Sequence, residues 1–361
     1  LIMTGPSSSY RFYEKYGITL LFGGAGSTNG ETLVTLVNVE EVEFDDFLWN
    51  PPTSSYNYKF GSLGVNDDLL GSNDADVFDP AGGWDRIVGY EGEDVVVIWG
   101  YSEDFEVYTK YGITKVIGLS SAPAEYAGKA MTLLGVEKIS FFDEDIDVDV
   151  TEYGAITYTY NNNLITGGND QDVWDIAGGD DIVDGNGGDD YVLIFAKSSD
   201  FTYTTLYGVT KLYGNGNSLI YGYDVITLVD VEYVEFVLDD FQWHPTTENY
   251  NVELGYMGPE IFTGTDGQDV YDPGGGADII DGKGGNDYVI LFDDKADFEI
   301  VYMYGVTKIW GKDTSKFFYK GQVITLQNVE VAKFADQVII EHVRKNGGII
   351  ATMDKELKNK I

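Results

Sequence analysis

The chain has 361 residues, 43% of them apolar, and carries 61 acidic against 22 basic residues, for a formal net charge of −39. The apolar content supports folded cores, and the charge argues against nucleic-acid backbones and anionic membranes as partners. With no cysteine, disulfides and thiolate metal sites are excluded. No apolar run approaches the roughly 20 residues of a membrane span, and the start at Leu1 without a signal peptide predicts a processed or truncated chain.

Two short sequences return along the chain at a nearly fixed spacing. Tyr-Gly-Ile/Val-Thr occurs at 16–19, 111–114, 207–210 and 304–307, so the spacings are 95, 96 and 97. Val-Glu with a Phe four residues after the Glu, here named the VE segment, occurs at 39–44, 136–141, 231–236 and 329–334. Such self-similarity predicts a tandem array of units of about 96 residues. The predicted boundaries are 1–50 for the rear half of a unit, 51–148, 149–244 and 245–340 for three whole units, and 341–361 for a basic tail.

Each whole unit also contains three consecutive nine-residue repeats, or nonads, at 71–97, 167–193 and 264–290. The fourth residue of a nonad is usually Gly, although Asp74 and Asp170 replace it, and Asp tolerates left-handed backbone better than most residues. The eighth residue is a large β-former that can point inward from a short strand. The sixth residue is Asp in all nine nonads: Asp76, Asp85, Asp94, Asp172, Asp181, Asp190, Asp269, Asp278 and Asp287.

Chained turn–strand units of this length predict a flattened parallel roll in which alternate turns lie on opposite edges. Nonads one and three then share an edge, and their carboxylates, such as Asp269 and Asp287, stack roughly 4.8 Å apart. Two anionic groups so placed repel unless a cation lies between them. Calcium prefers six to eight oxygen ligands, and turn carbonyls can supply those that the carboxylates do not.

The nonads resemble the G-G-x-G-x-D-x-U-x repeat of the RTX (repeats-in-toxin) family. The resemblance implies a calcium-binding parallel β-roll in an exported bacterial protein. It covers the three triplets closely and the remaining segments loosely, where the units look like those of large RTX adhesins and surface proteins. One site for each triplet is expected between Asp76 and Asp94, between Asp172 and Asp190, and between Asp269 and Asp287. The middle aspartates need a partner on the other edge, such as Asp68, Asp200 or Asp297.

The rest of each unit is expected to be antiparallel β-structure. In the last unit, 297–304 and 305–310 alternate as a hairpin that turns at the Gly, and 322–326 with 329–334 resembles another pair around Gln327 and Asn328. The 27 tyrosines are expected to serve cross-strand packing, with a stacking platform for sugars as the alternative. The fold class predicted is therefore all-β, a tandem array of calcium rolls each followed by antiparallel strands.

No enzyme motif accompanies this pattern. The two histidines, His244 and His342, are too few and too separated for a zinc HExxH site or a His-based triad. Three similar units also argue against catalysis, since catalysis normally needs one asymmetric site. The expectation is a non-enzymatic structural protein that is secreted to a bacterial surface and rigidified by calcium: a surface-layer, filament or adhesin-stalk component with self-association, cell-surface or glycan contacts. The alternatives are a carbohydrate-binding module, the non-catalytic repeats of a secreted RTX enzyme, and a virion appendage.

Overall fold

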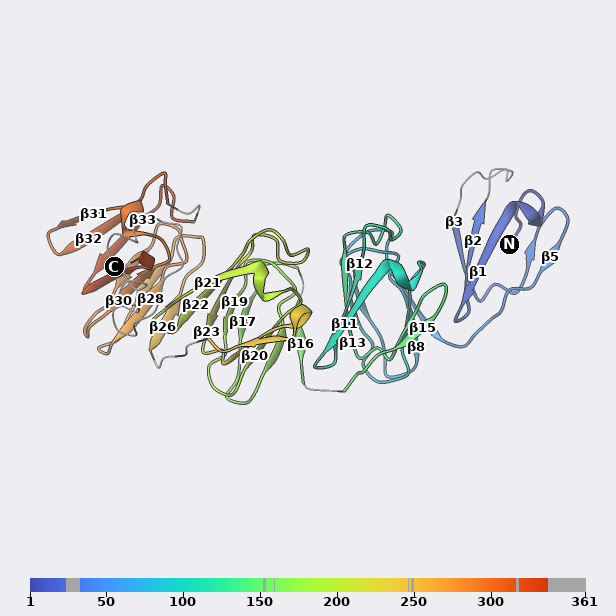
Figure 1. Cartoon of the computed structure of the whole chain (residues 1–361), viewed down its shortest axis with the longest axis horizontal. Coiled ribbons are helices and arrows are strands. Elements are labelled where there is room, and N and C mark those ends of the chain that lie inside the picture. Colours follow the sequence, from blue (N-terminus) through green and yellow to red (C-terminus); the bar gives the residue numbers. More distant parts are fainter. Residues whose placement is uncertain are drawn as a thin grey trace.

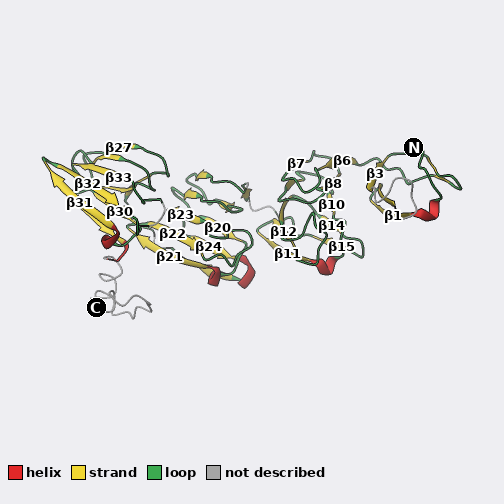
Figure 2. Ribbon diagram, turned by 90° about the horizontal axis from the view of Figure 1, so that it is seen from above, coloured by secondary structure: helices red, strands yellow, loops and turns green. Residues whose placement is uncertain are grey.

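The computed structural model describes residues 1–23, 33–151, 154–158, 160–245, 247, 250–315 and 318–336. Strands dominate them and form a row of four groups along the longest axis (Figure 1), which confirms the predicted all-β repeat architecture. Helical segments are short turns (Figure 2). The 3-10 helices are η1 (Ser7–Ser9), η2 (Ser102–Asp104), η3 (Ser198–Asp200), η4 (Val237–Asp239) and η5 (Lys295–Asp297). The predicted basic tail at 341–361, with His342, lies outside the described residues.

Each of the three larger groups pairs two sheets, here named the roll sheet and the hairpin sheet. The roll sheet contains the strands of nonads one and three, and the hairpin sheet contains that of nonad two. In 51–148 the roll sheet has the order β15 (Asp145–Asp147), β14 (Lys138–Ser140), β10 (Val95–Val97), β8 (Asp76–Asp79), β6 (Asn57–Phe60). The hairpin sheet has the order β11 (Phe105–Lys110), β12 (Ile113–Gly118), β13 (Ala130–Leu134), β9 (Arg86–Val88), β7 (Asp68–Leu70).

The same arrangement recurs in the next two ranges. In 149–244 the roll sheet is β16 (Ile156–Thr157), β18 (Val173–Asp175), β20 (Tyr191–Ile194), β24 (Tyr233–Phe236), β25 (Phe241–Trp243), and the hairpin sheet is β17 (Leu164–Thr166), β19 (Ile182–Asp184), β23 (Val225–Val229), β22 (Val209–Gly214), β21 (Phe201–Leu206). In 245–340 the roll sheet is β26 (Asn251–Leu254), β28 (Asp269–Asp272), β30 (Tyr288–Leu291), β34 (Val331–Phe334). The hairpin sheet is β27 (Ile261–Thr263), β29 (Ile279–Asp281), β33 (Val323–Gln327), β32 (Val306–Gly311), β31 (Phe298–Met303).

The first group, within 1–50, is smaller. Strands β1 (Tyr10–Lys15), β2 (Ile18–Gly23) and β3 (Leu33–Val37) form one sheet, and β4 (Val42–Glu43) pairs with β5 (Leu48–Trp49). Each sheet therefore takes its strands from a single one of the four predicted ranges.

Inside each roll the eighth residues of the nonads form the core, as the period predicts. They are buried between the two sheets together with apolar residues of the hairpin sheet. These nine residues are Phe78, Ile87, Val96, Trp174, Val183, Val192, Tyr271, Ile280 and Val289.

The predicted hairpin is confirmed, but the second predicted pair is wrong. β31 and β32 pair antiparallel around Tyr304 and Gly305, which both have positive φ. β33 and β34, in contrast, lie in different sheets and pair parallel to nonad strands β29 and β30. The chain turns between them at Asn328, whose φ of 52° forms a corner like those of the nonads. The VE segment thus forms the last turn of the roll, and the hairpin strands β31 and β32 are inserted into the roll between β30 and β33.

The units contact each other face to face. The hairpin sheet of one unit packs on the roll sheet of the next: Ile18 and Leu20 pack with Val77 and Val95, and equivalent clusters join the later units. The second and third junctions each bury an ion pair, with Lys115 Nζ 2.7 Å from Asp175 Oδ2 and Lys211 Nζ 2.6 Å from Asp272 Oδ2. In the first junction Leu20 occupies the lysine position, and Asp79 Oδ2 accepts a hydrogen bond from Trp99 Nε1 instead (2.9 Å).

Candidate metal centre

The nine nonad aspartates lie at the two edges of the rolls. All except the half-buried Asp172 are fully buried, with no exposed surface. Carboxylates seldom occur in such positions unless they are paired or bind a metal. The corners that hold them depend on glycine: Gly92, Gly188 and Gly285 have φ between 130° and 136°, a region that side chains rarely adopt. Asp74 and Asp170 do not have positive φ. The tolerance of Asp for left-handed backbone therefore does not explain why Asp replaces Gly at these two positions.

Nonads one and three share an edge, and their aspartates are linked through the backbone. The N–H of Asp76 donates to Asp94 Oδ1 over 2.7 Å. The same bond joins Asp172 to Asp190 at 2.8 Å and Asp269 to Asp287 at 2.9 Å. The side chain of the first aspartate is held by its own turn, as when Asp76 Oδ2 accepts from Ser72 N at 2.6 Å.

At seven of the nine positions, one carboxylate oxygen is buried and has no hydrogen-bond donor in the described part of the chain. Leaving such an oxygen unsatisfied costs about 1–3 kcal/mol, and more for a charged group. A bound cation would remove that cost. The orphaned atoms are Oδ1 of Asp76 and Oδ2 of Asp85, Asp94, Asp181, Asp190, Asp278 and Asp287.

Burial also makes the carboxylates reluctant to ionise without a cation. It raises the pKa of Asp85, Asp94, Asp181 and Asp278 to about 7 and that of Asp190 to about 6. Neighbouring carboxylates contribute in the same direction, although less than burial does, as Glu137 does beside Asp94. The electrostatics of the edges therefore favour either protonation or a divalent cation.

The middle aspartates have partners other than the predicted ones. Asp85 Oδ1 accepts from Asp67 N (2.8 Å), and Asp278 Oδ1 accepts from Glu260 N (2.9 Å). The corresponding donor to Asp181 is Asn163 N (2.8 Å). Asp68 instead pairs with Arg86, while Asp200 and Asp297 end the 3-10 helices η3 and η5. In 51–148 the roll begins before the triplet, with β6 and β7, so the donor to Asp85 comes from this earlier turn. An ion shared with Asp68, Asp200 or Asp297 stays a prediction.

Sequence reasoning used the VE segment as a landmark and missed its glutamate. Glu137 Oε2 accepts from Asp94 N at 2.7 Å, Glu232 Oε2 from Asp190 N at 2.9 Å, and Glu330 Oε2 from Asp287 N at 2.8 Å. The recurrence of Glu at one position in all four VE segments was the available signal.

The donor set fits a hard cation bound largely by backbone oxygens. The described residues contain no group of three or more His, Cys, Asp or Glu placed to hold a metal by side chains alone. Two carboxylates and several turn carbonyls are, however, the mixture that calcium accepts. His244 is exposed and contacts the ring of Tyr233 rather than any acidic edge.

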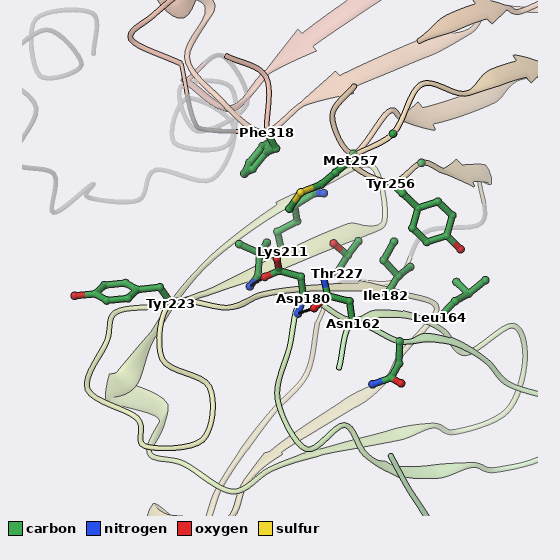
Figure 3. A pocket seen from close by; sticks show the side chains of 15 residues that line it. Asn162, Leu164, Asp180, Ile182, Lys211, Tyr223, Thr227, Tyr256, Met257 and Phe318 are labelled. Atoms are coloured by element: carbon green, nitrogen blue, oxygen red, sulfur yellow. Dashed lines mark hydrogen bonds between the residues drawn. The ribbon is translucent and has the colours of Figure 1, made fainter. Parts of the chain in front are cut away.

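A separate cavity of about 570 Å³ lies between the second and third whole units. Figure 3 shows Met257 and Phe318 of the later unit across from Ile182 and Thr227 of the earlier one. At the preceding junction this place is taken by Tyr160, whose hydroxyl donates to Ala130 O (3.0 Å). Met257 occupies the equivalent position, seven residues before the nonads, and does not fill the space.

No family model matches the chain, and no curated protein matches it. Among solved structures it is similar to the extracellular lipase LipA from Serratia marcescens, with 12% identity and a TM-score of 0.16 over 76% of this chain and 38% of that one. The chain thus spans well under half of the lipase. No helix among the described residues is long and apolar enough to cross a membrane.

Proposed function

We propose that this chain is a calcium-stabilised structural array, secreted to a bacterial surface, in which the nonad aspartates bind calcium. The orphaned, fully buried carboxylate oxygens carry this proposal. They recur at the same nonad position in three units, and a cation supplies the one interaction that each of them lacks. The array is non-enzymatic in this proposal because the same site is repeated and the units are joined end to end, which suits an extended scaffold.

Calcium binding would couple folding to location. Where calcium is scarce, ionised corners repel each other and the rolls are unstable. At millimolar calcium the ions neutralise the corners, and since they bind only the ordered roll, their binding energy adds to folding stability.

Excess calcium chelator tests the proposal. We expect it to lower the melting temperature by about 20 °C or more, since several sites are lost together. A matched rise in ionic strength without chelation is the control and should have a small effect. The same melting temperature in calcium and in chelator would contradict the proposal.

A second candidate function is glycan binding, which the cavity between the second and third whole units favours. Its lining includes Tyr223, which is 80% exposed, and Tyr256, which is 45% exposed. Exposed aromatic rings beside amide side chains such as Asn162 suit a sugar. Glycan binding that is abolished by Tyr256→Ala and retained by Tyr304→Ala, a tyrosine that is 96% exposed and lies outside the cavity, would support this function. Equal binding by both variants would contradict it.

A further inference from the structure

The roll edge that carries nonads one and three continues for one more turn. β14, β24 and β34 of the VE segments pair parallel to the third-nonad strands β10, β20 and β30. The VE segment therefore occupies the place that a fifth nonad would take on this edge of the coil.

The glutamate of the VE segment repeats the bond that an aspartate makes one turn earlier. Asp94 Oδ1 accepts from Asp76 N at 2.7 Å, and Glu137 Oε2 accepts from Asp94 N at 2.7 Å. Asp94 follows Gly89 by five positions, but Glu137 follows Gly135, the equivalent corner, by only two. The additional methylene of Glu lets its carboxylate reach the same place from the shorter turn.

The orphaned oxygen of the third-nonad aspartate points toward this last turn. A Cβ atom on Gly89 would collide with both Asp94 Oδ2 and the carbonyl oxygen of Gly135. The two oxygens thus converge on the opening glycine of the third nonad. The other units repeat the arrangement at Gly185, with Asp190 Oδ2 and Asp230 O, and at Gly282, with Asp287 Oδ2 and Asn328 O.

We propose that each whole unit holds a further calcium site between its third nonad and its VE segment. The ligands are Oδ2 of the third-nonad aspartate, the carboxylate of the VE glutamate and the carbonyl of the VE corner, completed by other turn oxygens. The three sites are Asp94 with Glu137 and Gly135, Asp190 with Glu232 and Asp230, and Asp287 with Glu330 and Asn328. This inference rests on the calcium binding proposed above and extends it to residues outside the RTX-like repeat.

The number of calcium ions bound by the full chain tests it. Protein stripped of calcium is dialysed against calcium, and bound metal is measured by elemental analysis. We expect Glu232→Gln to bind one ion fewer than the wild type and Asp190→Asn to bind two fewer, because Asp190 faces both gaps. The Gln amide oxygen still accepts from Asp190 N, so that variant keeps the fold, which circular dichroism checks.

Glu40 supplies the matched control. It occupies the same position in the VE segment of 1–50, where the sequence has no nonads and Glu40 is exposed. Glu40→Gln should therefore bind as many ions as the wild type. If Glu232→Gln and Glu137→Gln both retain the wild-type number, the glutamates only accept hydrogen bonds and this inference is overturned. If the wild type itself binds no calcium, the proposed function fails.

Discussion

Replacing Lys115 by Met should destabilise the junction between the first two whole units. Lys115 and Asp175 are both fully buried, 2.7 Å apart, and Lys115 Nζ also donates to Thr132 Oγ1 over 2.5 Å. Methionine keeps the length of the side chain but leaves the carboxylate of Asp175 buried without its cation. Breaking a buried pair in this way costs about 3–5 kcal/mol.

Thermal unfolding at constant calcium measures the effect. The transition that contains the two joined units, about 190 residues, should shift by about 2–4 °C for each kcal/mol, and hence by about 6–20 °C. Lys308→Met is the matched control, since Lys308 has the position in β32 that Lys115 has in β12 but is exposed. Its expected cost in stability is within about 0.5 kcal/mol. Equal shifts for the two variants would refute the reasoning.

The first junction indicates how the loss could be rescued. There Leu20 replaces the lysine, and Trp99 donates to Asp79. Phe195 is the residue equivalent to Trp99, and its ring centroid lies 5.4 Å from Lys115 Nζ. Lys115→Leu combined with Phe195→Trp should therefore be more stable than Lys115→Leu alone, because the indole N–H replaces the lost donor to Asp175.

Three further predictions concern the roll edges. Asp287→Ala should lower the calcium stoichiometry and loosen only the last unit, as hydrogen exchange would report; uniform loss of protection would contradict the modular reading. Gly285→Ala should cost about 1–3 kcal/mol in chemical denaturation, since Gly285 has φ 132° and its Cβ would meet Gly267 O. Gly284→Ala should cost less, because its Cβ would meet Asp266 only at an ordinary contact distance of 3.6 Å. Without calcium, the folded carboxyls with pKa about 7, such as Asp94 and Asp181, bind protons that the unfolded chain releases, so stability should fall as pH rises from 5 to 7.5. With calcium, stability should instead rise with pH, because protons compete with the ion for the carboxylates. Equal pH profiles with and without calcium would count against the edge sites.

The period of nine was sufficient to predict the rolls because each nonad repeats its own local chemistry. A corner, a carboxylate and one inward apolar residue recur whatever the neighbouring unit contains, so the buried positions of Ile87 or Val289 follow from the pattern alone. The partners of β33 and β34 could not be predicted in this way. Their alternating residues suit antiparallel pairing with each other as well as parallel pairing with nonad strands, and only the corner at Asn328 decides between them.

The junction pairs were missed for a related reason. Lys115 and Asp175 are 60 residues apart, and Lys211 and Asp272 are 61 apart, so each pair crosses a unit boundary and neither member is unusual in its own segment. The ninth residue of every first nonad is Asp, which was the available signal. Its role depends on which face of the roll meets the preceding unit, and that follows from tertiary packing rather than from the repeat.

One short strand connects the two kinds of carboxylate. β28 begins with Asp269 at the proposed calcium edge and ends with Asp272 at the junction with Lys211. Calcium at the edge would fix the position of this four-residue strand and hence that of Asp272. Asp269→Asn and Lys211→Met should therefore show an interaction free energy of about 0.5–3 kcal/mol in a double-mutant cycle with calcium present. Asp269→Asn with Lys115→Met, one junction away, should be additive within about 0.5 kcal/mol. Additivity in both cycles would mean that calcium stabilises each unit without strengthening its contact with the next.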